Sequence, residues 1–425
     1  MLRWFHLEGV GPAPDMRLDL SKRLNVLTGD NGVGKSFLLD TAWWALTRTW
    51  AGNPALPRDG AKKATISYAI RGKTREAEAV VSTYRFAEQE WPLKATRPAM
   101  TGIVVYARVD GGFSVWDPAR NYWRNAPSLG ISDRERPASY NFDHQSVWSG
   151  LAVNGKQACE GLIRDWVSWQ KGNEPEFDLL ARILEELSVP EEPLRIGPPR
   201  RVRLGEGYDT PTLETSYGTV PITHASAGIR RAVALAYLLV WAWREHRLAS
   251  ELSRREPDHR LVLLIDEPET HLHPKWQRLF VPAVLRAVEG LREQESAETQ
   301  LITATHAPMV LASLEPIFDP EQDDLVHLDL RDGRVEVRSG MWAKQGDAVS
   351  WLTSEVFNLE QARSREAERA VEAAEALMRG EKASLPAGLQ TRQAIDQELR
   401  RLLPPHDPFW PRWLVSNTPR ARRRA

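Results

Sequence analysis

Apolar and polar positions alternate along the first quarter of the chain, a pattern that predicts short strands. Three such stretches precede residue 28. Four more follow between residues 64 and 116, separated by Gly72, Pro92 and the turn sequence Asp110-Gly111-Gly112. We expect these later four to form antiparallel hairpins. The seven expected strands cover residues 2–7, 16–20, 24–27, 64–71, 77–86, 102–109 and 113–116.

Further along the chain, apolar residues recur at helical spacing, and two continuous apolar runs appear between the helical segments. The runs at residues 261–265 and 300–305 are typical of strands that are buried in a parallel sheet. Helices alternating with such strands predict an α/β fold. The expected helices cover residues 37–47, 162–169, 177–187, 227–246 and 276–291.

The remaining segments are expected to be hairpins and a loop. Residues 202–204 and 213–222 form one expected hairpin, and residues 325–330 and 334–337 flank a second turn at Arg331-Asp332-Gly333. Residues 121–142 are rich in Pro, Ser, Asn and Arg, which predicts a loop.

The end of the chain has a different character. Residues 361–378 are rich in Ala, Glu and Arg with apolar side chains on one face, and residues 392–403 form a second expected helix. The basic tail, residues 419–424, is expected to be disordered. We therefore expect four regions: 1–149 with the hairpins, 150–194 as a helical subdomain, 195–340 with the buried strands, and 341–425 as a helical appendage.

Composition narrows the class of protein. The net charge of −1 over 425 residues argues against a chain that binds nucleic acid with its whole surface. The single cysteine, Cys159, excludes a disulfide framework and favours a reducing compartment. The N-terminus lacks a signal pattern, and the longest apolar run, 232–243, is too short to span a membrane. We expect a cytoplasmic protein with no membrane partner.

Tryptophan is unusually frequent, with 17 residues. Those within apolar segments, such as Trp43 and Trp241, are expected to pack in the core. For a second group in the middle of the chain, core packing and a binding surface both remain open. That group is Trp116, Trp123, Trp148, Trp166 and Trp169.

The candidate chemistry begins at residues 29–36, which read Gly-Asp-Asn-Gly-Val-Gly-Lys-Ser between an expected strand and an expected helix. This is the phosphate-binding loop G-x-x-x-x-G-K-[ST] in the context that it requires. Its backbone N–H groups can surround a phosphate, Lys35 can reach the β- and γ-phosphates, and the Ser36 hydroxyl can bind Mg²⁺. The expected nucleotide-binding residues are Gly29, Asn31, Gly32, Gly34, Lys35, Ser36 and Phe37.

A second motif is the apolar run that ends in Asp266-Glu267. A carboxylate at the end of this strand can hold Mg²⁺, and Glu267 can polarise the water that attacks the γ-phosphate. An apolar run that ends in two acids is common where a strand simply reaches solvent. Together with the phosphate-binding loop, however, it predicts ATP hydrolysis.

Three further positions complete the pattern. Ser226 and Gly228 lie at the start of a long expected helix, where Ser226 can cap the helix and the N-terminus can bind an anion. His306 follows the second buried strand, so it lies beside Asp266-Glu267 if the two strands are neighbours. Gln145 lies between the loop and Ser226 along the chain.

This order of motifs resembles the ABC-type ATPases, in particular the SMC, RecF and OLD-like group. The resemblance implies a P-loop NTPase head with a RecA-like mixed sheet, an antiparallel β subdomain, a helical insert and a helical C-terminal appendage. It implies that Lys35 and Ser36 are the Walker A residues and that Asp266 and Glu267 are the Walker B aspartate and the catalytic glutamate.

The remaining motifs of the group are matched by position as much as by residue type. The resemblance makes Ser226-Ala227-Gly228 the signature core, with Ala227 in place of a glycine, and 269–273 the D-loop. His306 would be the switch histidine and Gln145 a Q-loop residue at the metal. In this group the signature of one protomer closes on the Walker A site of another, which implies a head-to-tail dimer around ATP and Mg²⁺.

Several members of the group are excluded. The chain has no room for the long heptad segments of SMC proteins. It lacks the acidic strand-end set of a fused Toprim nuclease, and its hairpins and helical end do not suit a transporter subunit. It looks most like the small "AAA family" ATPases of bacterial anti-phage systems such as Septu and its retron-linked relatives. That resemblance implies a separate effector, often an HNH nuclease.

Two alternatives stay open. A RecF-like DNA-repair ATPase would need a basic groove, for which the candidates are Arg195, Arg200, Arg201, Arg203, Arg230 and Arg231. A nucleotide-dependent scaffold with negligible turnover is the other. His271 and His273 are two residues apart without a third ligand, so we do not expect a metal site there.

Overall fold

The computed structural model describes residues 1–71, 79–92, 101–121, 137–291 and 298–416. The chain divides into two compact units, Met1–Ala348 and Val349–Ala425. Each unit is described by itself.

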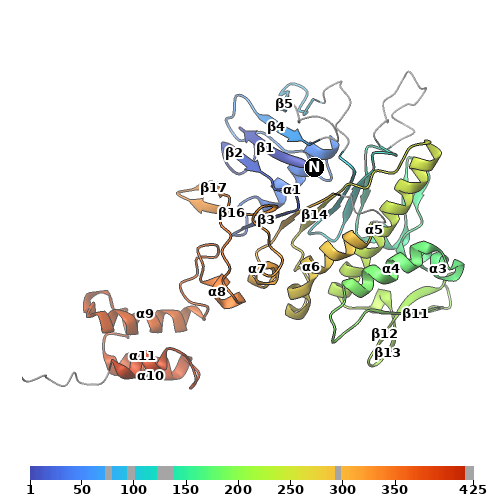
Figure 1. The fold of residues 1–425 in the computed structure, drawn as a ribbon. Coiled ribbons are helices and arrows are strands. Elements are labelled where there is room, and N and C mark those ends of the chain that lie inside the picture. Colours follow the sequence, from blue (N-terminus) through green and yellow to red (C-terminus); the bar gives the residue numbers. More distant parts are fainter. Residues whose placement is uncertain (72–78, 93–100, 122–136, 292–297, 417–425) are drawn as a thin grey trace, which may run out of the picture. The chain divides into compact units, whose positions relative to one another are not determined.

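The first unit is built around a sheet of eight strands in the order β17-β16-β3-β15-β14-β6-β7-β8 (Figure 1). The five strands from β16 to β6 run parallel, and the remaining strands pair antiparallel at the two edges. The strands are β3 (Leu24–Gly29), β6 (Ile103–Ala107), β7 (Phe113–Trp116), β8 (Tyr140–Phe142), β14 (Leu261–Asp266), β15 (Thr299–Ala304), β16 (Asp323–Arg331) and β17 (Arg334–Arg338).

A second, antiparallel sheet has the order β2-β1-β4-β5. Helix α1 (Lys35–Thr47) packs against β1 of this sheet and against β3, β6, β14 and β15 of the large sheet. Its Trp43 and Trp44 are both buried, and one hydrophobic core includes residues of both sheets and of the helix. The strands are β1 (Leu2–Glu8), β2 (Asp15–Asp19), β4 (Thr65–Ile70) and β5 (Val80–Thr83).

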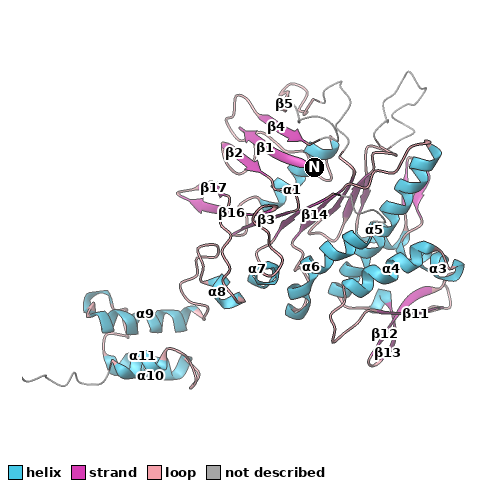
Figure 2. Ribbon diagram, viewed as in Figure 1, coloured by secondary structure: helices cyan, strands magenta, loops and turns pink. Residues whose placement is uncertain are grey.

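The other helices of this unit pack on one another and on the large sheet (Figure 2). The longest, α5 (Ala227–Leu252), contacts α4 and β6, and α4 contacts α6. A hairpin and a three-stranded sheet lie among them. These elements are α2 (His144–Ser149), β9 (Leu151–Val153), β10 (Lys156–Cys159), α3 (Leu162–Gly172), α4 (Pro175–Glu186), β11 (Arg195–Arg200), β12 (Thr210–Thr215), β13 (Gly218–Pro221), α6 (Pro274–Gly290) and α7 (Pro308–Leu314).

The second unit is helical and has a small core of its own, formed by alanines of α9 with Ile395, Leu399 and Trp413. The buried carboxylate of Asp407 pairs with Arg363, which ties the segment before α9 to the one after α10. The helices are α8 (Ala348–Leu352), α9 (Arg365–Arg379), α10 (Arg392–Leu402) and α11 (Trp410–Val415).

The predicted fold class is confirmed, and so is the antiparallel hairpin of residues 102–109 with 113–116, because β6 pairs with β7. The sequence did not predict that β6 also joins the large sheet, parallel to β14. Two local predictions were wrong. The end of the expected loop 121–142 is strand β8. Residues 202–204 form no strand; β12 pairs instead with β11, which contains Pro198 and Pro199.

The middle group of tryptophans belongs mainly to the core. Trp116, Trp166 and Trp169 are buried, and Trp148 is half-buried. Cys159 is buried and its Sγ lies 2.9 Å from the Tyr237 hydroxyl, as expected for a packing residue. Trp123 and the basic tail at 419–424 lie outside the described residues. None of the described helices is long and apolar enough to cross a membrane.

One buried side chain connects the two sheets. The amide of Gln300, in β15, donates from Nε2 to the carbonyls of Leu2 and Ser21, both at 2.8 Å, and its Oε1 accepts from the Leu2 N–H at 2.9 Å. Gln300 is 1% exposed. Removing this amide leaves backbone groups of β1 buried without partners.

We predict that Gln300→Leu lowers the free energy of unfolding by about 2–4 kcal/mol, because Leu cannot replace three buried hydrogen bonds. Urea unfolding of the purified variant measures this change. Gln322→Leu, at an exposed position, is the control and should cost no more than about 0.5 kcal/mol. Equal effects of the two substitutions would contradict the role given to Gln300.

Candidate functional site

The loop at residues 29–36 depends on glycines with positive φ. Gly29 has φ 141°, and a Cβ there would lie 2.1 Å from the Leu328 carbonyl oxygen. Gly34 has φ 98°, and a Cβ there would lie 2.8 Å from Pro12. Larger residues at these two positions would push apart the segments that hold the loop. The loop therefore has the backbone that a phosphate-binding loop requires.

Lys35 is the first residue of α1 and is 6% exposed. Its Nζ donates to the carbonyl of Gly29 at 2.7 Å and to that of Asp30 at 2.8 Å. Burial lowers the pKa of its ammonium group, and the negative charges of Glu267 and Asp266 partly oppose this shift. The lysine thus lies between its own loop and the acidic residues that end β14.

Asp266 ends β14 and is 1% exposed. Burial raises the pKa of its carboxyl to about 6, with Glu267 and Asp40 adding to the rise, whereas the nearby Ser36 hydroxyl acts to lower it. Its buried Oδ1 has no hydrogen-bond partner among the described residues. An orphaned carboxylate oxygen beside a serine hydroxyl is a donor set that fits Mg²⁺.

Glu267 has φ 49°, and its N–H donates to the Ala304 carbonyl at 2.9 Å. Its carboxylate lies 3.5 Å from His306 Nδ1 and accepts from the Thr270 hydroxyl at 3.2 Å. The left-handed backbone turns this side chain away from the line of the strand, an arrangement found where function requires it.

His306 lies beside Glu267 because β15 and β14 are neighbours, as the sequence predicted. Glu269, 6% exposed, accepts from the Thr305 hydroxyl at 2.9 Å and from the His306 N–H at 3.0 Å. Its Oε1 also lies 3.4 Å from His306 Nδ1. Glu269 therefore orients the histidine, a role that the sequence did not reveal because its partners are 36 or more residues away.

The turn at Ser226 has the expected cap. The Ser226 hydroxyl accepts from the Ile229 N–H at 3.3 Å, and both Ser226 and Ala227 are exposed. Gly228 is buried, and a Cβ there would lie 2.7 Å from the His271 carbonyl oxygen. In the described part of the chain, Ser226 makes no hydrogen bond to the phosphate-binding loop.

Gln145 is the second residue of α2, which follows β8 at the edge of the sheet. Its side chain is exposed and, among the described residues, makes no hydrogen bond to Asp266, so its assignment to the metal stays a prediction. His273 caps α6 by accepting from the Lys275 N–H at 3.3 Å. It shares no cluster of metal-ligating side chains with His271 in the described ranges.

Asn31 and Ser36 are exposed, and Phe37 borders an open cavity of about 420 Å³ beside the loop. The cavity gives a bound nucleotide room next to the start of α1. It is lined by Gly11, Phe37, Leu56, Pro57, Arg58 and Asp59.

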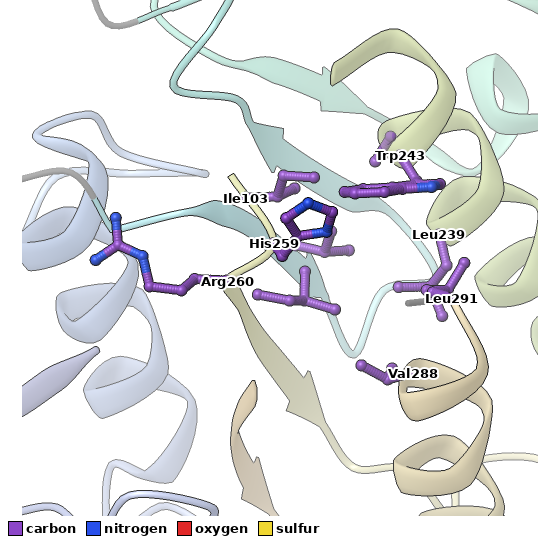
Figure 3. A pocket seen from close by; sticks show the side chains of 10 residues that line it. Ile103, Leu239, Trp243, His259, Arg260, Val288 and Leu291 are labelled. Atoms are coloured by element: carbon purple, nitrogen blue, oxygen red, sulfur yellow. The ribbon is translucent and has the colours of Figure 1, made fainter. Parts of the chain in front are cut away.

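A second cavity lies where β6 and β14 begin, at the opposite end of these strands (Figure 3). It measures about 20 Å³, room for one water molecule. Figure 3 shows His259 among apolar side chains that include Trp243 and Leu239. This cavity is a gap in packing and is not a ligand site.

Two residues near the loop were not predicted from the sequence to belong to the site. Asp40 lies one helical turn after Ser36, and burial raises the pKa of its carboxyl, whereas the nearby Tyr106 hydroxyl acts to lower it. Arg231, assigned to a possible basic groove, instead donates from Nη2 to the Asp266 carbonyl at 2.7 Å. The position of Asp40 one helical turn after Ser36 could have predicted that it lies near the loop, whereas no feature of the sequence around Arg231 predicted its contact with Asp266.

Comparison with known proteins agrees with this geometry. The family model described as AAA domain, putative AbiEii toxin, Type IV TA system, matches residues 24–312. The chain is similar to the Septu protein PtuA of Bacillus thuringiensis, with 19% identity over 389 residues that cover 86% of each protein.

Solved structures with similarity to the chain include an Smc head bound to the C-winged helix domain of ScpA. It is 14% identical with a TM-score of 0.40, covering 80% of this chain and 97% of that one. The recombination mediator protein RecF is also 14% identical, with a TM-score of 0.38 and coverage of 79% and 98%.

We predict that Asp266→Asn stabilises the nucleotide-free protein at pH 7.5 by about 1–3 kcal/mol. The pKa of Asp266 is near 6 in the folded protein, above its value in the unfolded chain. Between these two pKa values the native state therefore binds more protons than the unfolded state. The free energy of unfolding therefore falls as pH rises through this window, and the Asn variant avoids that loss. Its advantage should vanish towards pH 4, as urea unfolding at several pH values would show.

The control for this experiment is Asp59→Asn, at an exposed position, which should change stability little at any pH. An Asp266→Asn effect of the same size at every pH would contradict the raised pKa.

Proposed function

The chain belongs to the AAA domain family described as putative AbiEii toxin, Type IV TA system, and we propose that it binds ATP with Mg²⁺ and hydrolyses the γ-phosphate bond. One observation carries this proposal: Lys35, Ser36–Asp266 and Glu267–His306 meet at the carboxyl ends of adjacent parallel strands. Ligands bind at this edge in open α/β sheets.

Each side chain has a part in the reaction. The Lys35 ammonium gives up its hydrogen bonds to the carbonyls of Gly29 and Asp30 and binds oxygens of the β- and γ-phosphates instead. The loop N–H groups bind the β-phosphate. Ser36 and Asp266 are the residues that would hold Mg²⁺. The ion, when bound, supplies charge neutralisation between the two phosphates.

Glu267 accepts a hydrogen bond from the attacking water and takes up its proton. His306, oriented by Glu269, donates to a γ-phosphate oxygen and so offsets the charge that develops during cleavage. The contact of 3.5 Å between His306 and Glu267 supports their acting on the same phosphate.

We further propose that two protomers close head to tail around ATP. The exposed Ser226 turn begins α5, and its free N–H groups and helix dipole suit a phosphate supplied by another chain. In the described residues of one protomer this turn makes no hydrogen bond to the loop, so in this proposal a second copy supplies that contact.

The similarity to the Septu protein PtuA supports a role in anti-phage defence, in which the ATPase controls a separate effector such as an HNH nuclease. The second unit, Val349–Ala425, has its own core, and we assign it to effector binding.

The alternative of a DNA-repair ATPase loses support from the arginines proposed for it. Arg231 lies under the end of β14, and Arg201 and Arg203 pair with Asp209 and Glu206. DNA binding that depends on salt and on ATP would revive this alternative.

We predict that Glu267→Gln keeps ATP affinity but lowers kcat by about 10²–10⁴-fold, because Gln cannot accept the proton of the attacking water. ATP-bound dimer should then accumulate, as light scattering after gel filtration would measure. Lys35→Ala is the matched loss-of-binding variant and should show no nucleotide binding by titration. Unchanged turnover of the Gln variant would exclude Glu267 as the base.

We predict that removal of Val349–Ala425 leaves ATP turnover within about twofold of the full chain while effector binding is lost, since the residues assigned to the ATP site all belong to the first unit, Met1–Ala348. Co-purification with the nuclease encoded by a neighbouring gene measures binding. A chain that lacks only residues 417–425 is the control. Retention of the effector by the shorter chain would reject the assignment.

A further inference from the structure

Arg231 lies five residues after the cap residue Ser226, in the second turn of α5. Its guanidinium donates to three backbone carbonyls. Nη2 bonds Asp266 at 2.7 Å and Arg108 at 3.4 Å, and Nη1 bonds Val109 at 3.4 Å. Asp266 ends β14, and Arg108 and Val109 follow β6, the neighbouring parallel strand. One side chain therefore bridges the carboxyl ends of two adjacent strands from a helix that belongs to neither.

The charge of Arg231 is placed among acids without an ion pair. No carboxylate of the described residues lies within 4.0 Å of its guanidinium nitrogens. Burial lowers the pKa of the guanidinium, whereas the charges of Asp266, Glu269 and Glu267 act to raise it. Burial raises the pKa of Asp266, and the charge of Arg231 partly opposes this rise. The arginine thus favours the ionised form of the Asp266 carboxylate, while its planar, forked guanidinium group holds the Asp266 backbone.

The start of α5 is held at a second point by close packing. Gly228 lies against the His271 carbonyl, where even a Cβ would come within 2.7 Å. The segment 267–273 that contains His271 continues directly from Asp266. The first turns of α5 therefore touch the end of β14 through Arg231 and the following segment through Gly228. These two contacts connect Asp266 and the segment after it to the turn that contains Ser226.

We propose that Arg231 is a positioning residue that couples the metal-binding end of β14 to the Ser226 turn, and this inference rests on the proposed ATPase function. The planar fork sets the position of the Asp266 backbone and hence of the carboxylate that would hold Mg²⁺. The guanidinium also fixes the position of α5 relative to β14. The Ser226 turn therefore faces the second protomer only when Asp266 is in its metal-binding position. Binding of ATP phosphates by Lys35 does not use this coupling.

The test compares Arg231→Met, which removes charge and fork, with Arg231→Lys, which keeps the charge alone. Arg247→Met and Arg247→Lys, at an exposed position of the same helix, are the matched controls. A fluorescent ATP analogue is titrated in EDTA and at a series of Mg²⁺ concentrations. Dimer formation with ATP is measured in the Glu267→Gln background.

We expect Arg231→Met to bind the analogue in EDTA within about twofold of the parent protein. The Mg²⁺ concentration needed for tight binding should rise by about 10- to 100-fold, the range seen when a group that orients a metal ligand is lost. ATP-dependent dimer should be absent at Mg²⁺ levels that suffice for the parent. Arg231→Lys should recover only part of the Mg²⁺ response, because an ammonium cannot bridge three carbonyls.

Two results would overturn the inference. One is a parental Mg²⁺ response and dimerisation in Arg231→Met. The other is an equal loss of binding in EDTA and in Mg²⁺, which a purely structural role predicts. If the proposed ATPase function failed, the parent protein would bind the analogue without turnover. The Mg²⁺ titration would still decide the role of Arg231, so the two failures can be distinguished.

Discussion

The parallel register of β3, β15, β14 and β6 is the constraint on which the site depends. Ala304 pairs with Leu27 on one side and with Asp266 on the other, so β15 and β14 end at one level and β3 continues beyond them to Gly29, where the loop begins. The hydrogen bonds from Glu267 to Ala304 and from Thr305 to Leu27 continue this register past the strand ends. A slip of two residues would move Asp266 by about 6.6 Å relative to the loop. The lysine, serine and carboxylates could then no longer share one phosphate.

Burying the carboxylates of the site has an electrostatic cost. Asp266 and Glu269 each keep a buried oxygen without a partner among the described residues, and burial raises the pKa of Asp266. A folded protein rarely retains such groups without a purpose. Lys35 and Arg231 offset the negative charge from opposite sides, one from the start of α1 and the other from α5. The site is thereby suited to a cation and to an anionic ligand together.

Local patterns were sufficient for most of the fold. The phosphate-binding loop, the run before Asp266 and the run before Thr305 each have a pattern that is complete within ten residues. The hairpin of β6 with β7 was predicted, but the parallel pairing of β6 with β14 was not, because the turn after β6 points only to the hairpin. All five residues of β6 are buried, as are those of β3 and β14. Strand β11 tolerates Pro198 and Pro199 because it lies at the edge of its sheet, a context that the sequence does not display. The contacts of Arg231 and Glu269 join segments far apart in sequence, so only the assembled sheet could reveal them.

The burial of α1 between two sheets has a consequence for how salt acts on this molecule. Small ions screen charges over about 10 Å at 0.1 M, but chiefly where those charges face water. Lys35 is buried, whereas Arg195 and Arg200 are exposed. Salt therefore acts differently on two kinds of anion binding by this protein. Anion contacts with the exposed arginines weaken as salt rises, whereas attraction by the Lys35 ammonium weakens less, because protein covers most of this side chain.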